Sequence, residues 1–498
     1  MTSNFQLKNL MIGLTQLEDR HTGNYIKLKL EEMMLEWNLL DVPNVPIFFT
    51  TDNGANICNA IRQSSWNHIH CFAHTLQLVI KDCQKHTKGI EKLLKKVKFI
   101  VLIIESIANL KIIMKLNLFM IESNLIRNIQ NIFLTQFFFQ ARHITTHFHQ
   151  SEPARRDFEN AQKVSSDKTP LKLIQSVPTR WNSDYDMLER MKKLQQPLSV
   201  ALSRSASVTG LSGTDWKRIS DIINVLDPLN EATKISCGSK YPTISMIESI
   251  IQGIKEALEN LNFDHETNVG LNNFNDEGSD YDDNNNDEDL EISTCENESQ
   301  MPMGYNFSTN IIRSLKIRFC EIEQDTLYRK CTFLDPRYRD YFLTDEKMKD
   351  DIKKGIKDEI IACKFSNNVF ENEHETVAEP PVIKPTKFWD FMKQRQTNRE
   401  ETVTLRLEKD IDQELIQYMY SENIDPWDDP IQWWKKESIK YPLLSLMARR
   451  YLPIPSTSVE SERLFSTAGD IVTEKRNSLS PDNVARLLFL NKNLNRYV

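Results

Sequence analysis

The sequence predicts an α/β unit at the N-terminal end, followed by a large all-α region. The first observation is a short apolar run, VPIFFTT, which stops abruptly at Asp52 before a turn, as is typical of a strand. The second is a set of long runs from residue 141 onward, such as WKRISDIINVLDPLNEATKIS, in which apolar residues recur at helical spacing. The chain has 498 residues, enough for two or three domains.

The first hundred residues are predicted to alternate between strands and helices. Thr22 and Gly23 form a turn that opens an amphipathic helix, and the VPIFFTT run is expected to be a short buried strand. In order, the expected elements are a strand at 9–17, a helix at 21–39, a strand at 45–51, a helix at 54–63, and a strand or turn leading into a helix at 68–85.

Charge is unevenly distributed along the chain. Residues 264–298 hold thirteen Asp and Glu and no Lys or Arg, and without them the formal net charge changes from −8 to +5. We expect this segment to be a disordered loop, because it is too poor in apolar side chains to form a core. The rest is mildly basic, which fits either contact with nucleic acid or an ordinary solvated basic face.

Cysteine usage and hydropathy point to an intracellular protein. The eight cysteines form no CxxC pair, so we expect reduced thiols. No apolar stretch is both long enough and free enough of polar side chains to cross a membrane, so no membrane partner is expected.

Residues 101–140 differ in composition from the rest of the chain. They are dominated by Ile, Leu, Asn, Lys and Phe, whose codons are AT-rich. The segment begins with Val, whose codons start with GT, and ends in Phe-Phe-Phe-Gln, which a pyrimidine tract followed by CAG can encode. One hypothesis is therefore an in-frame retained intron. The alternative is a buried or partner-binding pair of helices.

The C-terminal region carries two helix-start signals. Ser480 is predicted to cap a final helix that has Pro481 at its first position. Thr457 with Glu460 three residues later matches a capping box. Glu462 lies about 200° around the helix from Glu460, so capping does not explain it, and spacing alone favours an exposed surface residue. The final helix is mostly apolar and must be covered by its own domain or by a second subunit.

Six motifs follow one another along the chain, namely HTGNYI, TTDNGANICNAI, HIHCFAHTLQLVIKD, VPTRWNSDYDMLERM, TFLDPRYRDYF and the long run WWKKESIKYPLLSLMARRYLPIPSTSVESERLFSTAGDIVTEKRNSLS. Their order resembles that of the hAT superfamily of DNA transposases, and within it the BED zinc-finger transposase-derived proteins. The resemblance implies an RNase H-like core interrupted by a helical insertion, and a C-terminal segment that serves in dimerisation. It also implies a nuclear location, self-association as a homodimer or higher oligomer, and DNA as a partner.

On this resemblance the chain divides into six segments. They are a partial RNase H-like core at 1–100, the possible intron at 101–140, a helical insertion domain at 141–263, the acidic loop at 264–300, more of the insertion with a linker at 301–400, and the core-closing and dimerisation region at 401–498.

The resemblance also assigns roles to residues of the core. Family members cut DNA with three carboxylates that hold two Mg²⁺ ions, and Asp52 matches the second acid and Glu462 the third. Oxygen ligands suit Mg²⁺, and the carboxylates offset the charge of the ion pair. Cys71 and His74 match a Cys-x-x-His motif that helps to position DNA. With His68 and His70 nearby, a zinc site is the alternative, but structural side chains are favoured and zinc is not expected, because no second ligand pair is evident.

Further residues are implied in DNA binding and in dimerisation. Arg180 and Trp181 match an Arg-Trp pair whose tryptophan stacks on a displaced base, the alternative being a core aromatic. The apolar residues implied in dimerisation are Leu464, Phe465, Val484, Leu487, Leu488 and Leu490.

Two family features are missing from the sequence. The family's first catalytic aspartate and its BED finger have no match, and the only acids before His21 are Glu18 and Asp19, which lie next to the turn. We therefore expect an N-terminally truncated, catalytically inactive transposase-derived protein, with Mg²⁺ required only if the site is complete. The alternatives are an active transposase completed by Asp19 or an unseen exon, and an interaction protein in transcription or chromatin.

Overall fold

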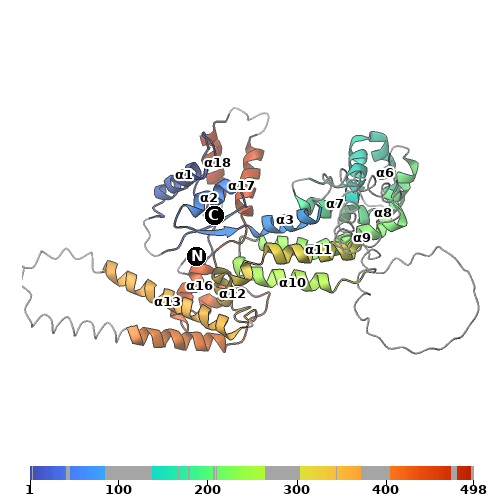
Figure 1. Ribbon diagram of the computed structural model, residues 1–498. Helices are drawn as coiled ribbons and strands as arrows, with labels where there is room; N and C mark the ends of the chain where they lie inside the picture. The colour runs from blue at the N-terminus through green and yellow to red at the C-terminus, as the bar shows by residue number, and fades with distance from the viewer. Residues whose placement is uncertain are drawn as a thin grey trace, which may run out of the picture. The chain divides into compact units, whose positions relative to one another are not determined.

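The computed structural model of the chain describes residues 1–84, 137–263, 303–371 and 404–494 (Figure 1). Short gaps fall at 3, 41–44, 139, 166–168, 178–179, 206–207, 209, 344 and 473–478. The chain clusters into two compact units. Unit 1 contains Met1–Thr75, Thr233–Gln252 and Phe319–Val498, and unit 2 contains Leu76–Ala232 and Gly253–Arg318. Residues 101–136 and the acidic segment 264–300 lie outside the described residues, so the hypotheses about them stay predictions.

The described part of the molecule is mostly helical, as predicted, and contains two strands. β1 (Phe48–Thr51) and β2 (Asn67–His70) pair in parallel, with Thr51 opposite His70. α2 (Ala55–Arg62) lies between them in sequence and supplies the crossover that parallel pairing requires. The predicted strand at 45–51 and helix at 54–63 are thus confirmed, although the residues of β1 are half-buried and not fully buried.

The predicted Thr-Gly turn opens α1 (Gly23–Glu36), which Figure 1 shows beside α2. The Thr22 hydroxyl accepts a hydrogen bond from the backbone N–H of Tyr25 at 3.3 Å, which is an N-cap. A Cβ added to Gly23 would lie 2.8 Å from Nδ2 of Asn59 on α2. Glycine is therefore required here because the two helices approach closely, and the motif has a structural role.

The strand predicted at 9–17 is wrong. Met11 is extended, but its backbone pairs with a side chain and not with another strand. Its N–H donates to the Asn493 side-chain oxygen at 3.0 Å, and its carbonyl accepts from the Asn493 amide nitrogen at 2.9 Å. Asn493 lies on α18 (Pro481–Leu494). The primary amide thus satisfies the two groups that a neighbouring strand would have bonded, and Leu10 stays 50% exposed.

Aromatic side chains fill the core of unit 1. The Trp434 indole donates to the Leu334 carbonyl at 2.8 Å, and the Tyr418 hydroxyl donates to the Phe333 carbonyl at 3.0 Å. Both acceptors lie at the end of α12, where carbonyls have no partner within the helix. The predicted turn FLDPRYRDYF follows directly and is confirmed. The helices of this region are α12 (Thr326–Phe333), α13 (Glu346–Glu371), one over 404–419, α15 (Pro430–Glu437) and α16 (Pro442–Tyr451).

Unit 2 is helical in its described part. Its helices are one over 140–150, α6 (Glu152–Ser165), α7 (Trp181–Lys193), α8 (Gln195–Arg204) and α11 (Met303–Arg318), with most of α3 (Phe72–Gln84), α9 (Gly213–Ser236) and α10 (Ile247–Glu259). Arg142 binds the buried Asp184 carboxylate through both oxygens, each at 2.7 Å. Arg318 binds Asp82 in the same two-oxygen manner, which ties α11 to α3.

The run WNSDYDMLERMKKLQQPL forms two helices instead of a single one. Pro197 explains the break, because a proline ring clashes with the carbonyl four residues earlier, here that of Lys193. α7 ends at Lys193 and α8 begins at Gln195, with Leu194 between them. Proline is tolerated in the first turn of α8.

Asn493→Ala is expected to lower the free energy of unfolding by about 2–4 kcal/mol, because it leaves two buried backbone groups of Met11 without partners. Urea titration followed by circular dichroism measures the change. Asn491→Ala, an exposed position on the same helix, is the matched control and should change the value by less than about 0.5 kcal/mol. Equal effects of the two variants would contradict the pairing.

Candidate functional site

Asp52 lies at the carboxyl end of β1, as predicted. Its side chain accepts a hydrogen bond from the backbone N–H of Gly54 at 3.1 Å, which forms the turn into α2. The residue is exposed. The carboxylate is thus fixed at the strand edge by one oxygen and faces solvent, where it can accept a ligand.

The C-terminal part of the chain returns to this strand edge. The Thr50 hydroxyl on β1 donates to the Pro455 carbonyl at 2.7 Å, and the Phe72 N–H donates to the Ser456 carbonyl at 2.9 Å. The Cys71 thiol accepts from the Ser458 N–H at 3.3 Å. These contacts place the start of α17 (Val459–Ile471) beside the carboxyl ends of β1 and β2.

Glu462 lies in the first turn of α17 and is exposed. Among the described residues its carboxylate makes no hydrogen bond or ion pair. Asp52 and Glu462, predicted from opposite ends of the chain, both belong to unit 1, where hydrogen bonds join residues 455–458, directly before α17, to β1 and to the residues that follow β2.

The capping box predicted for Thr457 and Glu460 is wrong. α17 begins at Val459, so Ser458 is its N-cap residue, and Glu460 is one position short of the place where a capping-box glutamate acts. Glu460 instead binds Lys492 of α18 at 2.5 Å and Arg463 of its own helix. Its role is to join α17 to α18.

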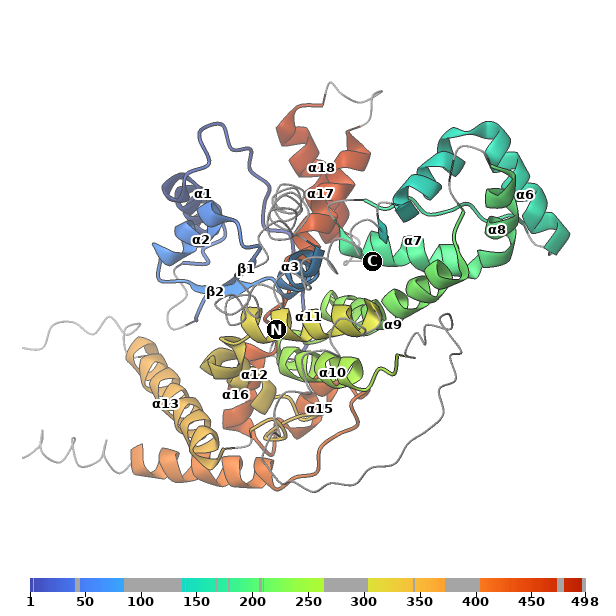
Figure 2. The same cartoon turned by 45° about the vertical axis from the view of Figure 1, so that its right-hand side comes forward.

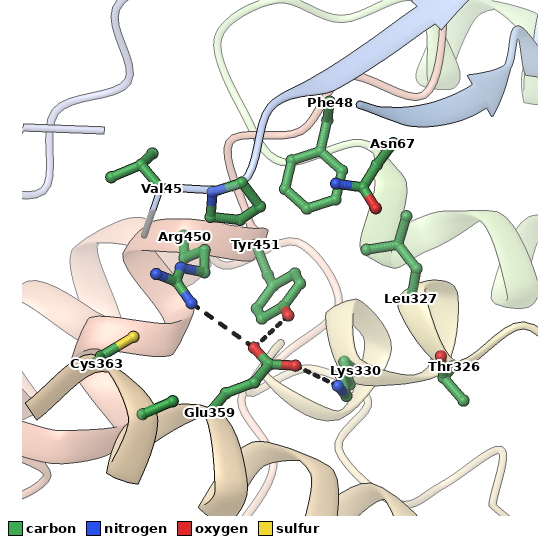
Figure 3. Close-up of a pocket in the computed structure, with 12 residues that line it drawn as sticks. Val45, Phe48, Asn67, Thr326, Leu327, Lys330, Glu359, Cys363, Arg450 and Tyr451 are labelled. Atoms are coloured by element: carbon green, nitrogen blue, oxygen red, sulfur yellow. Dashed lines mark hydrogen bonds and ion pairs between the residues drawn. The ribbon is translucent and has the colours of Figure 1, made fainter. Parts of the chain in front are cut away.

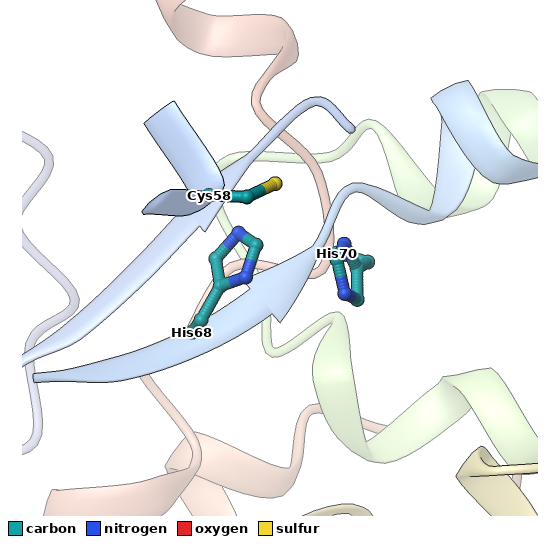
Figure 4. A group of neighbouring side chains, drawn as sticks. All are labelled: Cys58, His68 and His70. Carbon is teal, nitrogen blue, oxygen red and sulfur yellow. The ribbon is translucent and has the colours of Figure 1, made fainter. Parts of the chain in front are cut away.

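Three carboxylates for a pair of Mg²⁺ ions do not gather in the part of the chain that the structure describes. The group of potential ligands found there is Cys58, His68 and His70, at the edge of β2 (Figure 4). Asp19 and Glu18 belong to no such group and lie at the turn before α1. Asp52 and Glu462 likewise belong to no such group among the described residues, so their role as Mg²⁺ ligands stays a prediction.

Sequence reasoning considered His68 and His70 as zinc ligands together with Cys71 and His74, but it missed Cys58 as their neighbour. The signal for the histidine pair was available, because His68 and His70 are two apart on a strand and therefore share one face. The His68 ring accepts from or donates to the Thr51 hydroxyl at 2.8 Å. Burial lowers the pKa of His68 to about 4, with further contributions from His70 and Arg62, so its imidazole is neutral near pH 7.

The residues predicted for DNA contact lie in different settings. Arg180 is exposed and is the N-cap residue of α7, whereas Trp181 is only 4% exposed in unit 2. Stacking of Trp181 on a base would therefore require the start of α7 to open. Cys71 is buried by its contact with Ser458, and His74 is half-buried on α3. Their DNA-binding roles stay predictions.

The predicted dimerisation residues fall into two groups. Leu464, Val484 and Leu488 pack with Met11 inside the chain, between α17 and α18. The others are exposed, namely Phe465 at 62%, Leu487 at 42% and Leu490 at 46%. Figure 2 shows the two helices side by side. The helix pair thus covers one apolar cluster with its own chain and leaves three large apolar side chains outside that cluster exposed.

A pocket in unit 1 has its charges paired. It has a volume of about 500 Å³ and is lined by α12, α13, α16 and β1 (Figure 3). The Glu359 carboxylate binds Lys330 and the Tyr451 hydroxyl, and lies 3.8 Å from an Arg450 nitrogen. The two cations are thus held by one carboxylate within the chain, which makes this pocket a weaker candidate than the strand edge.

Comparison with known proteins connects these features to two family descriptions. Residues 414–494 match the hAT family C-terminal dimerisation region, and residues 119–225 match the ZBED1 RNase-like helical domain. The resemblance predicted from the motifs is thereby confirmed. The second match includes residues 119–140, the last part of the segment with unusual composition.

Three relatives match along most of the chain. Zinc finger BED domain-containing protein 4 of Homo sapiens is 19% identical, and the match covers 97% of this chain and 34% of the relative. A Talaromyces stipitatus protein, whose name includes the words transcriptional regulator, is 22% identical, and the match covers 97% of this chain and 49% of the relative. A Zea mays protein, whose name includes the words AC transposase, is 21% identical, and the match covers 97% of this chain and 52% of the relative. The chain thus spans between a third and about half of the length of these relatives.

No described helix is long and apolar enough to cross a bilayer. The cysteines in the described ranges, at 58, 71, 83, 237, 320, 331 and 363, are free thiols.

Glu460→Gln is expected to have a pH-dependent effect on stability. Burial alone would raise the pKa of Glu460, but hydrogen bonds from Lys492 and Arg463 outweigh it and lower the pKa below its ordinary 4.5. The folded carboxyl thus binds a proton less readily than the unfolded one, so its contribution is complete above pH 4.5 and is lost as the pH falls through the depressed value.

Urea midpoints of the wild type and Glu460→Gln, measured from neutral pH downward, check this dependence. The difference in urea midpoint between the wild type and Glu460→Gln should be constant near neutral pH and should shrink as the pH is lowered. Glu462→Gln, on the same helix turn, is the matched control and should differ from wild type by less than about 0.5 kcal/mol at neutral pH. A Glu460→Gln difference that persists unchanged in acid would contradict the ion pair.

Proposed function

Since the chain carries the hAT C-terminal dimerisation region and is related along most of its length to BED zinc-finger proteins, we propose that it is a transposase-derived nuclear protein that self-associates and does not cleave DNA. Self-association proceeds through α17 and α18. DNA binding accompanies it, through the exposed Arg180 and the strand edge near His74. The nuclear location rests on the names of the relatives, which describe a transposase and a transcriptional regulator.

The observation that carries this proposal is the open apolar face of the α17–α18 pair within the matched residues 414–494. Phe465, Leu487 and Leu490 are exposed there although the same helices bury Leu488 and partly bury Leu464 within the chain. Large exposed apolar side chains grouped on one face are typical of protein interfaces. A second copy would cover them, most simply through a two-fold axis.

An RNase H-like core is the architecture we propose around β1, α2 and β2. The parallel strand pair with a crossover helix and an aspartate at the carboxyl end of β1 support it, as does the match to an RNase-like helical domain. Cleavage would need two Mg²⁺ ions, which together carry +4, whereas Asp52 and Glu462 supply −2. Without a third carboxylate the described residues leave the ions under-neutralised and incompletely held, which favours a protein that binds without cutting.

An active transposase is the second candidate. The hydrogen bonds that join the segment directly before α17 to β1 and to Cys71 favour it, because they bring the beginning of Glu462's helix to the part of the fold that carries Asp52. A third carboxylate brought from outside the described residues would complete such a site.

Replacing Leu487 and Leu490 together by Asp should convert the protein to monomers, because two charges on the apolar face would lose solvation in the interface. Light scattering of the purified chain gives the mass. Leu488 is unsuitable for this test, since it is 1% exposed and its substitution would disturb the fold.

Ile439→Asp is the matched control for the dimer test. Ile439 is 91% exposed and also lies within residues 414–494, but outside α17 and α18. This variant should keep the wild-type mass. An unchanged mass in the soluble Leu487/Leu490 double variant would refute the interface.

The purified chain is expected to give no strand cleavage of a terminal-inverted-repeat duplex with Mg²⁺ or Mn²⁺, because the described residues offer two of three carboxylates. Gel analysis of end-labelled DNA detects the product. Cleavage that is abolished by Asp52→Asn or by Glu462→Gln would establish the active transposase instead. Binding of the same duplex, measured by mobility shift, should persist in both variants.

A further inference from the structure

We propose that Cys58, His68 and His70 form a binding site for a zinc-class divalent cation, next to Asp52 but separate from any magnesium centre. The potential ligand atoms of the three residues lie within 4.8 Å of one another. Figure 4 shows the cysteine on α2 projecting toward the two imidazoles on β2.

The fold itself brings the three ligands together. His68 and His70 are two residues apart on β2, so both project from one face, and their ring centroids are 4.4 Å apart. Cys58 lies on the crossover helix that leads from β1 to β2. The site is thus built on regular elements, whose backbones hold ligands more precisely than loops do.

The donor set selects the class of metal. One thiolate and two imidazoles suit Zn²⁺ and related borderline-soft ions, whereas Mg²⁺ and Ca²⁺ require oxygen ligands. Tetrahedral ligands at about 2.0–2.3 Å from zinc lie about 3.5 Å from one another, so closure needs side-chain shifts of about 1 Å. Three protein ligands leave the fourth position for water.

Each imidazole already has a partner that can orient it. His68 Nε2 is 2.8 Å from the Thr51 hydroxyl, and His70 Nδ1 is 2.7 Å from the Asn53 side-chain oxygen. Since an imidazole has two ring nitrogens, each ring retains one to offer to a metal. Oxygen partners on the second nitrogen are the usual support of metal-binding histidines.

A cation bound at this site would add positive charge next to Asp52. The Cys58 thiol is 3.8 Å from the Asp52 backbone oxygen, so the cation would lie against the residue that the family likeness assigns to magnesium. Binding releases the thiol proton to solvent and adds one net positive charge to the strand edge. The Asp52 carboxylate and the phosphates of DNA are both attracted by that charge.

Cobalt titration of the chelator-stripped full chain tests the site. One equivalent of Co²⁺ should bind tightly to the protein. Its spectrum should show the thiolate charge-transfer absorption and the visible bands of tetrahedral coordination. Adding Zn²⁺ should displace Co²⁺ and abolish both of these absorptions. Octahedral spectra without the charge-transfer absorption would overturn the proposal.

Variants separate this site from adventitious binding. His70→Ala, at an exposed position, and Cys58→Ser should each remove the tight equivalent while circular dichroism stays unchanged. Thr51→Val should weaken binding about 10–100-fold by removing an orienting partner. The matched controls Cys320→Ser and His21→Ala, both at exposed residues, should bind as the wild type does. Tight binding that survives both Cys58→Ser and His70→Ala would overturn the proposal.

Discussion

The hydrogen bonds that join residues 455–458 to the carboxyl ends of the two strands are the constraint on which the rest of unit 1 depends. The Thr50 hydroxyl donates to the Pro455 carbonyl, and the Phe72 N–H donates to the Ser456 carbonyl. The Ser458 N–H donates to the Cys71 thiol. Two of these three bonds use backbone groups of the C-terminal segment as acceptors, so they depend on its path more than on its side chains. They fix where α17 begins, and hence where Glu462 and the α17–α18 pair lie.

The same constraint involves Cys71, the cysteine of the family motif, whose buried thiol accepts a hydrogen bond from the Ser458 N–H. A buried thiol that accepts a backbone hydrogen bond cannot also face DNA without breaking that bond. The neighbouring strand edge retains a different thiol, Cys58, which is only half-buried and has histidines close by. Cys71 and Cys58, thirteen residues apart in sequence, thus differ in burial, and the half-buried Cys58 is the one that we propose as a metal ligand.

Sequence reasoning succeeded where the signal was local. The β1 run, the turn at Asp52, the Thr22 cap and the Ser480 cap, whose hydroxyl accepts from the Asn483 N–H at 3.4 Å, all depend on neighbours within a few residues. It failed at Met11, where the partner of the backbone is the amide of Asn493, 482 residues away. It failed in the same way at Glu460, whose partner Lys492 lies on another helix. No window of sequence contains these partners.

The Asn493 amide also sets the order in which the chain can become structured during synthesis. Unit 1 includes both Met1–Thr75 and the final segment, so its N-terminal strands emerge from the ribosome long before α18 exists to receive Met11. Unit 2 ends at Arg318 and has no such requirement. The two backbone groups of Met11 therefore stay without their Asn493 partner until the last residues of the chain are translated, so unit 1 cannot complete its folding before synthesis ends.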